Sequence, residues 1–191
     1  MKFSLSLAIL LFVLSHYSYS RQINENILFS IGKTKSIKKE SSLAFNTNKH
    51  TVFIFLSPEC PLCKNYIKYL NQVQSGNPEI QFISIFPGKS YNKEVLSKFV
   101  SSFDLKGKWL IDDNKEITKK LKATVTPEVI VVNKTGKVIY SGLIDDRIIS
   151  LGAQRPVIKE KYLEQVLSKL ATSGTANFTS TKPIGCLIND Y

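Results

Sequence analysis

Two cysteines, Cys60 and Cys63, are spaced for thiol–disulfide chemistry. They lie between the continuous apolar run 51–56 and a helical pattern over 65–70, so we expect a helix to begin at the cysteines. The free N–H groups and the positive dipole end of a helix N-terminus stabilise a thiolate. Since the thiolate is the attacking form of cysteine, this position predicts that Cys60 is a nucleophile near neutral pH. Pro61 suits the first helical position, where its missing N–H group costs nothing.

The same pair of cysteines could instead form a structural disulfide or half of a metal site. A zinc site that uses CXXC normally requires a second pair of cysteine or histidine ligands. Beyond residues 1–20, the sequence offers only Cys186 and His50 for that purpose. The strand–helix context therefore favours redox chemistry, and we expect no metal and no bound cofactor.

Apolar periodicity predicts the elements that position these cysteines. The predicted strands cover residues 51–57, 80–86, 109–111, 127–132 and 137–144, with a short edge strand at 26–31. The predicted helices cover residues 61–75, 91–103, 114–121 and 156–171, and Asn114 is expected to cap the third of them. A crossover helix makes the first two long strands parallel, whereas the turn 133–136 makes the last two antiparallel. This order predicts an α/β fold with a mixed central β-sheet and helices on both faces.

The order of these elements, with Cys60-Pro61-Leu62-Cys63 and a strand opened by Thr126-Pro127, resembles the thioredoxin superfamily. The resemblance extends over residues 45–172 and implies a thioredoxin-like fold. It also implies that Pro127 follows a cis peptide bond and lies against the CXXC pair. Thr126 would then present its backbone to an incoming peptide, so that the two residues form a substrate groove. Only about 5–6% of X–Pro bonds are cis, which makes this implication specific.

A closer likeness is to exported redoxins of the thiol-specific-antioxidant (AhpC/TSA) and TlpA-like type. The segments that carry it are Glu59–Cys63, Thr126–Val129, Gly142–Arg147 and Thr181–Ile188. This likeness implies protein thiols or disulfides as substrates and a redox partner protein. The Cys60 thiolate would attack a substrate disulfide, and Cys63 would release the product by forming the Cys60–Cys63 disulfide. Pro61-Leu62 differs from the Gly-Pro of thioredoxin, so the reducing behaviour of thioredoxin does not carry over.

Two other functions remain open. The segment 57–60 matches the Ser/Thr-x-x-Cys part of a peroxiredoxin site, which would make Cys60 the thiol of an antioxidant peroxidase. The proline expected four residues before Ser57 is replaced by Phe53, and no partner arginine can be identified. Since peroxide reduction needs donors arranged around the leaving oxygen, this function is the runner-up. The third interpretation is a redox-inert, thioredoxin-like binding module.

Charged residues indicate a soluble surface rather than a nucleic-acid site. The net charge is +11, but the lysines are scattered along the chain, and the cluster at 33–39 has no aromatic platforms around it. We therefore expect no nucleic-acid partner. The residues Asp145-Asp146-Arg147 are interpreted as a surface loop with an internal ion pair.

Residues 1–20 have the features of a secretory signal peptide: Lys2, an apolar run over 4–14 and small residues before Arg21. The apolar run is too short for a comfortable membrane span, so no stable span is expected after cleavage. Export would place the protein in the periplasm or outside the cell. The predicted division is a signal peptide over 1–20, a thioredoxin-like domain over 21–172 and a C-terminal tail with Cys186 over 173–191.

Cys186 makes the number of cysteines odd, so at least one thiol is unpaired or shared between partners. It has three interpretations. It is an auxiliary thiol that exchanges disulfides with Cys60 or Cys63, a cysteine that pairs with another chain, or a free thiol in a tail. Export puts the cysteines in an oxidising compartment, where a free thiol is a liability. That consideration favours a functional role for Cys186.

Overall fold

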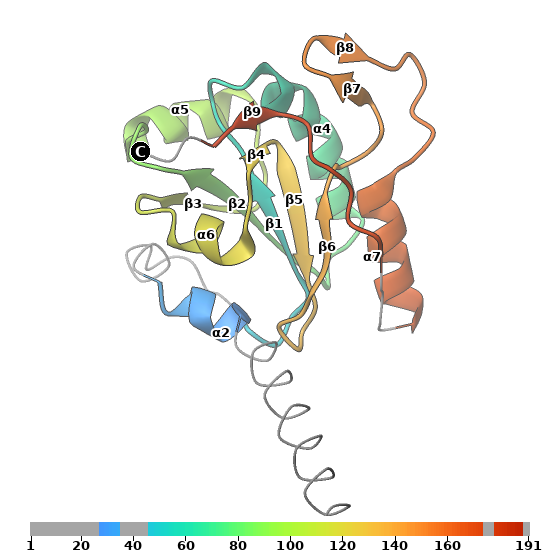
Figure 1. Ribbon diagram of the computed structural model, residues 1–191. Helices are drawn as coiled ribbons and strands as arrows, with labels where there is room; N and C mark the ends of the chain where they lie inside the picture. Colours follow the sequence, from blue (N-terminus) through green and yellow to red (C-terminus); the bar gives the residue numbers. More distant parts are fainter. Residues whose placement is uncertain (1–26, 35–45, 174–177, 189–191) are drawn as a thin grey trace, which may run out of the picture.

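The structure is a computed structural model that describes residues 27–34, 46–173 and 178–188 (Figure 1). The predicted signal peptide, residues 1–20, lies outside the described residues, so its cleavage stays a prediction. Within the described part of the chain, no helix combines the length and the apolar character that a membrane crossing requires.

Five strands form the central sheet, in the order β3-β2-β1-β5-β6. They are β1 (Thr51–Phe55), β2 (Gln81–Pro87), β3 (Lys108–Asp112), β5 (Glu128–Val132) and β6 (Val138–Gly142). β1 pairs in parallel with β2, and β2 with β3, whereas β5 is antiparallel to both β1 and β6. The predicted mixed sheet is therefore confirmed, including the turn 133–136 that joins β5 to β6.

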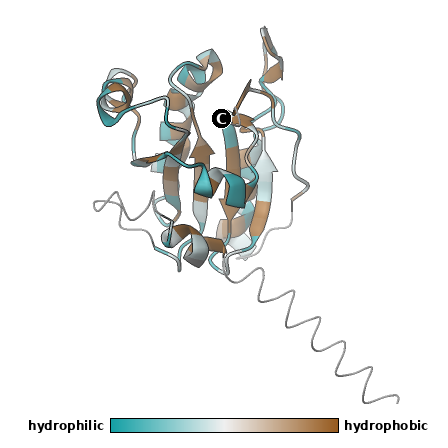
Figure 2. Ribbon diagram, turned by 60° about the vertical axis from the view of Figure 1, so that its left-hand side comes forward, coloured by the Kyte–Doolittle hydropathy of each residue, from teal (hydrophilic) through white to brown (hydrophobic). Residues whose placement is uncertain are grey.

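Helices cover both faces of this sheet, as the sequence predicts. Val52 and Ile54 of β1 belong to a core formed with α4 (Pro61–Ser75), α5 (Lys93–Ser102) and α7 (Tyr162–Ser173). Phe53 and Phe55 point to the other face, where α2 (Ile27–Gly32) and α6 (Glu116–Leu121) lie. Figure 2 shows apolar residues concentrated on the strands between the two layers of helices.

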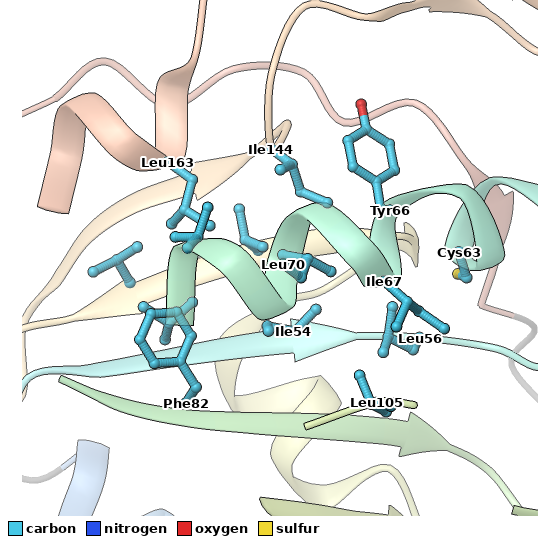
Figure 3. Packing of buried hydrophobic residues seen from close by; sticks show 14 of the residues in the cluster. Ile54, Leu56, Cys63, Tyr66, Ile67, Leu70, Phe82, Leu105, Ile144 and Leu163 are labelled. Carbon is cyan, nitrogen blue, oxygen red and sulfur yellow. The ribbon is translucent and has the colours of Figure 1, made fainter. Parts of the chain in front are cut away.

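Helix α4 carries the cysteine pair and is fixed along its whole length to the sheet. Its buried residues recur every three or four positions, which gives one continuous apolar side: Leu62, Cys63, Tyr66, Ile67, Leu70 and Val73. In Figure 3, Ile67 and Leu70 lie between the helix and strand β1. The helix ends at Ser75, and the N–H group of Gly76 donates to Gln72 O. The predicted helix 61–75 is thus confirmed.

The predicted edge strand at 26–31 is wrong, because Ile27–Gly32 form the helix α2. Leu28 and Ile31 are both buried in the core beneath α6. Residues three positions apart share one side of a helix but point to opposite faces of a strand. The spacing of these two buried residues therefore suits a helix and not a strand.

Helix α7 begins at Tyr162, later than the predicted start at residue 156. The preceding segment is held in an irregular conformation by Asp146, whose carboxylate accepts hydrogen bonds from Lys159 N (2.9 Å) and Glu160 N (3.1 Å). The N–H group of Asp146 donates to Glu160 O in return. Val157, which lies in this irregular segment, is exposed.

The predicted cap of α6, Asn114, is also wrong. Lys115 occupies the capping position in a left-handed conformation (φ 55°). The carboxylate of Asp112, at the end of β3, accepts hydrogen bonds from both Thr118 N and Thr118 Oγ1 at 2.8 Å. A buried aspartate thus satisfies the first turn of the helix, in the way that a capping side chain would.

The described residues also form four short strands outside the central sheet: β4 (Val125–Thr126), β7 (Ile148–Ser150), β8 (Ala153–Gln154) and β9 (Cys186–Leu187). β7 pairs with β8, and β9 pairs with β4 in the antiparallel direction. In Figure 1 the segment that ends in β9 runs from the region of α7 past β6 to β4. Residues 178–188 therefore pack on the domain, at the end of the sheet where α4 begins.

Candidate active site

Cys60 and Cys63 lie where the buried strand β1 gives way to α4. The chain turns after Ser57, whose carbonyl oxygen accepts a hydrogen bond from Cys60 N (3.2 Å). Cys60 is the N-cap residue of α4, in an extended conformation, and Pro61 opens the helix. Cys63 N donates to Cys60 O (3.1 Å), and the two cysteines approach to 3.9 Å. This is the placement that the spacing of the two cysteines predicts.

The two thiols are held in different protonation states. Burial is the largest cause that raises the pKa of Cys63, and its hydrogen bond to Cys60 raises that pKa further. The same hydrogen bond is the largest cause that lowers the pKa of Cys60, to about 4, against the opposing effect of burial. At neutral pH, Cys60 is therefore a thiolate that accepts a hydrogen bond from the protonated Cys63.

The Thr126–Pro127 peptide bond is cis, as the resemblance implies. Thr126 is buried, and its carbonyl oxygen lies 3.1 Å from Cys60 Sγ, which donates to it when the thiol carries its proton. The cis peptide thus lies directly against the first cysteine.

Cys186 lies at the same place, although it is far from the other cysteines in the sequence. In the pairing of β9 with β4, Cys186 stands opposite Thr126. Burial is the main cause that raises the pKa of Cys186 to about 11, and its hydrogen bond to Cys60 adds to the shift. All three cysteines are free thiols, and Cys63 and Cys186 are both hydrogen-bond donors to Cys60. The structure therefore brings together every site residue that the sequence singles out: Cys60, Cys63, Thr126, Pro127 and Cys186.

Glu128 is a residue of the site that sequence reasoning missed. It is buried, and its Oε2 atom accepts hydrogen bonds from Thr124 N (2.8 Å) and Val125 N (3.3 Å). Burial raises the pKa of the Glu128 carboxyl. These bonds hold the segment just before the cis peptide in place, so Glu128 positions Thr126. In the sequence, Glu128 belongs to the segment Thr126–Val129 that carries the redoxin likeness, but nothing there indicates its hydrogen bonds to residues 124 and 125.

A pocket of about 1230 Å³ opens beside the cysteines, and Cys60, Thr126 and Cys186 lie in its wall. Ser57 and Tyr91 line it nearby, with their hydroxyl oxygens 2.9 Å apart. Three lysines also contribute to its lining: Lys89, Lys115 and Lys119. None of the arginines in the described part of the chain lines this pocket.

Asp145 and Arg147 form the internal ion pair that the sequence predicts, but the loop is not a surface feature at Asp145. The Asp145 carboxylate is fully buried and accepts hydrogen bonds from Tyr66 OH (2.5 Å) and Arg147 N (2.9 Å). The Arg147 guanidinium pairs with it at 3.2 Å and lies 4.9 Å from the centroid of the Tyr66 ring. Because Tyr66 belongs to α4, this network fastens the cysteine-bearing helix to the loop after β6.

A five-stranded mixed sheet with a CXXC pair beside a cis-proline defines a thioredoxin-like protein. The sequence model of the Redoxin family matches residues 29–152. The chain therefore belongs to the Redoxin family, within the thioredoxin superfamily. None of the curated proteins matches the chain.

Among the solved structures that match the chain, two with TM-scores above 0.5 share this fold. An uncharacterised conserved protein from Geobacillus kaustophilus has a TM-score of 0.62 and 21% sequence identity, over 75% of this chain and 78% of that chain. A hypothetical protein from Sinorhizobium meliloti 1021 has a TM-score of 0.55 and 16% identity, over 74% of this chain and 80% of that one. A secreted disulfide oxidoreductase of Mycobacterium tuberculosis, described as homologous to E. coli DsbE, has a TM-score of 0.43 and 25% identity. That match covers 48% of this chain and 66% of the other.

Proposed function

We propose that this redoxin is an exported thiol–disulfide oxidoreductase that exchanges disulfides with protein thiols through Cys60 and Cys63. The observation that supports it most is the pair of thiols at the start of α4. Cys60 has a pKa of about 4, and the protonated Cys63 lies 3.9 Å away. Cys60 is thus a thiolate that can attack at neutral pH, and Cys63 stays protonated beside it until the second step.

The reaction begins when the Cys60 thiolate attacks one sulfur of a substrate disulfide. The substrate S–S bond breaks, a mixed disulfide forms with Cys60, and the departing substrate thiolate takes up a proton. Cys63 then loses its proton and attacks the Cys60 sulfur, so that the Cys60–Cys63 disulfide forms and the second substrate thiol leaves. Two electrons pass from the protein to the substrate, and a redox partner protein returns them. The same steps in reverse oxidise a substrate dithiol.

In this proposal Thr126 and Pro127 form the substrate groove. The Thr126 carbonyl lies 3.1 Å from Cys60 Sγ, so a peptide that pairs with β4 would present its own cysteine to Cys60. Residues 21–172 would carry out the reaction, residues 1–20 would direct export to the periplasm or beyond the cell, and residues 173–191 would supply Cys186.

A redox titration against glutathione, with thiol mapping by mass spectrometry, tests this proposal. In a Cys186→Ser variant, where Cys60 and Cys63 are the only thiols, we expect one reversible two-electron couple and a Cys60–Cys63 disulfide. Its midpoint gives the direction of electron flow. If these two thiols never pair, the proposed function is wrong.

Trapping experiments assign the two roles. With Cys186 already replaced by Ser, Cys63→Ser should accumulate a mixed disulfide between Cys60 and the substrate, because no thiol of the chain can release it. Cys60→Ser in the same background is the matched control, and we expect no mixed disulfide from it. Trapping by the control instead would reverse the roles of the two cysteines.

The same variants separate the alternatives. A peroxidase would reduce hydrogen peroxide with Cys60 alone in its first step, so Cys63→Ser would still be oxidised to a sulfenic acid. The absence of an arginine among the described residues of the pocket makes this function less well supported. A redox-inert binding module would keep its partner when both Cys60 and Cys63 are replaced by Ser.

A further inference from the structure

The edge of β4, where a substrate peptide would pair, is already occupied by the chain itself. β9 runs antiparallel to β4, with Cys186 opposite Thr126 and Leu187 opposite Val125. Beyond the paired residues, Ile188 N donates to Thr124 O (3.0 Å). A strand added to an exposed edge is a common way for a protein to bind an extended peptide. Residues 183–188 therefore have the position that an extended substrate would take.

Gly185 shows how closely this strand fits the cis peptide. A Cβ atom built on Gly185 would lie 2.3 Å from Thr126 O, 2.7 Å from Thr126 C and 3.2 Å from Pro127 N. Real Cβ atoms essentially never approach backbone this closely, so any side chain at this position would push the strand away from the cis peptide. The close packing of this strand on the cis peptide therefore depends on glycine directly before Cys186.

The segment is also fastened at a second point, beside β6. Thr181 N donates to Ser141 O (3.0 Å), and Thr181 Oγ1 accepts a hydrogen bond from Leu143 N (2.8 Å). Gly142 (φ +129°) permits this contact, since a Cβ atom there would lie 2.2 Å from Thr181 O. Only four residues lie between Thr181 and Cys186, so the anchor keeps the thiol close to Cys60 even when the β9–β4 pairing opens.

The side chains of β9 point in the directions that a reaction with Cys60 needs. Successive side chains of a strand point to opposite sides. Cys186 is half-buried and hydrogen-bonded to Cys60, whereas Leu187 is 77% exposed. Cys60 itself is only 1% exposed although it lies in the wall of the pocket, so an external substrate has little access to it in this arrangement.

We propose that residues 183–188 are an intramolecular substrate strand, which delivers Cys186 to Cys60 and forms a Cys60–Cys186 disulfide in competition with Cys63. The inference rests on the proposed function and adds to it a third redox thiol and a built-in competitor for the peptide groove. Reduction of the Cys60–Cys186 bond is then the step that frees the groove for a protein substrate.

The exchange balances in atoms and electrons. When Cys60 and Cys63 are linked, the Cys186 thiolate attacks the Cys60 sulfur. The Cys60–Cys63 bond breaks, the Cys60–Cys186 bond forms, and Cys63 takes up the proton that Cys186 lost. No electrons are gained or lost. When Cys60 carries a mixed disulfide with a substrate thiol, the same attack by Cys186 releases that thiol and leaves the Cys60–Cys186 disulfide.

The test uses the Cys63→Ser variant of the protein, treated with oxidised glutathione. Glutathione first forms a mixed disulfide with Cys60, and Cys186 then displaces it. For tethered groups the effective concentration is in the millimolar range, so at about 10 µM free glutathione we expect the internal disulfide to exceed the glutathione adduct about 100-fold. Peptide mapping by mass spectrometry measures both products. A persistent glutathione adduct at Cys60, or a Cys186–Cys186 dimer, would overturn the proposal.

Gly185→Val, in the Cys63→Ser background, tests the close packing of residues 183–188 on the Thr126–Pro127 peptide. The added side chain meets the Thr126 backbone, so we expect the ratio of internal disulfide to glutathione adduct to fall at least tenfold and iodoacetamide to label Cys60 faster. Leu187→Ala is the matched control, since it alters an exposed side chain of the same strand. Equal ratios in the two variants would show that the strand does not position Cys186, and circular dichroism verifies that both variants are folded.

The failure of this inference is distinguishable from the failure of the proposed function. If the Cys186→Ser variant forms the Cys60–Cys63 disulfide but Cys63→Ser never links Cys60 to Cys186, only the inference is wrong. If Cys186→Ser forms no such disulfide, the proposed function is wrong whatever Cys186 does.

Discussion

Cys63 and Cys186 both contact Cys60, but the structure holds them in different ways. Cys63 is fully buried on the first turn of α4, a helix of 15 residues with six buried side chains. Cys186 is half-buried on a two-residue strand, and its segment is tied to the domain by hydrogen bonds and by the partly buried side chains of Phe178, Ile184 and Ile188. Both have raised pKa values, so both are protonated beside the same thiolate.

This difference separates a fixed partner from a removable one. Releasing Cys63 from Cys60 would require α4 to leave the core, at the cost of much of the folding free energy. Releasing Cys186 requires a few backbone hydrogen bonds to open, each of which contributes about 1 kcal/mol, and the partly buried Ile184 and Ile188 to leave the core surface. We infer that Cys63 sets the reactivity of Cys60, whereas Cys186 sets access to it.

The largest expected effect concerns the ionisation of Cys60. With a pKa of about 4, Cys60 should remain a thiolate in the reduced protein at a pH where an ordinary cysteine, with a pKa of about 8.5, is protonated. The ultraviolet absorbance of the thiolate, measured against Cys60→Ser, follows this titration. Cys63→Ser should raise the pKa of Cys60 more than Cys186→Ser does, because the hydrogen bond from Cys63 is the largest cause of the shift. A larger rise in the pKa of Cys60 in Cys186→Ser than in Cys63→Ser would show that Cys63 does not set the reactivity of Cys60.

The same shift gives the stability of the reduced protein a pH dependence. The pKa of Cys60 is lower in the folded chain, so the unfolded chain binds more protons between the two pKa values. The stabilisation by the thiolate is therefore complete above the unfolded pKa and is lost as the pH falls towards about 4. The melting temperature of the reduced protein, relative to Cys60→Ser, should decrease over this range. Cys186 acts in the opposite sense, and its contribution is lost as the pH rises through about 11.

The next prediction concerns only α4, the helix that holds Cys63 beside Cys60. Asp145→Asn weakens the buried contacts that Asp145 makes with Tyr66 of α4 and with Arg147. Removing the charge from a buried pair is costly, and we expect a loss of about 3 kcal/mol in the free energy of unfolding. Denaturant titration measures it. The equilibrium between the Cys60–Cys186 disulfide and the glutathione adduct should change much less, because this network does not touch β9.

Asp104→Asn is the matched control for that substitution. Asp104 pairs with Lys106 at 2.6 Å, but both side chains are exposed. Exposed pairs contribute about 0–1 kcal/mol, so the control should unfold at nearly the same denaturant concentration as the wild type. Equal losses in the two variants would show that the Asp145 network does not hold α4.

The start of α4 with Cys60 and Cys63 could be predicted from the sequence, whereas Cys186 could be singled out there but the strand that carries it could not. A continuous apolar run, two cysteines and Pro61 lie within one short stretch, so local patterns are sufficient to place the helix start. β9 has only two residues and no periodicity, and the need for Gly185 arises from a contact with Thr126 that only the folded chain creates. The burial of Asp145 was missed for the same reason, since it depends on Tyr66, from a distant helix.

The smallest expected effect concerns residues 178–188, the segment that carries Cys186. Thr181→Val removes the hydroxyl that accepts from Leu143 N (2.8 Å) and contacts Tyr140 OH (2.9 Å). The domain core keeps its packing, and Tyr140 OH keeps its bond to Leu143 O. Loss of one such hydrogen bond corresponds to about 1 kcal/mol, or about a fivefold increase in the open population of the segment. Hydrogen exchange at Ile188 N, which donates to Thr124 O, measures that opening.

The exposed Thr179 provides the control for this last substitution, because Thr179→Val makes the same chemical change two residues earlier in the segment. Faster exchange at Ile188 in Thr181→Val alone, with an unchanged unfolding midpoint, would mean that the segment opens independently of the domain. If Thr181→Val instead lowered the unfolding midpoint as much as it speeds exchange, β9 would open only when the whole fold does. Cys186 would then be as fixed a partner of Cys60 as Cys63, and access to the groove would require global unfolding.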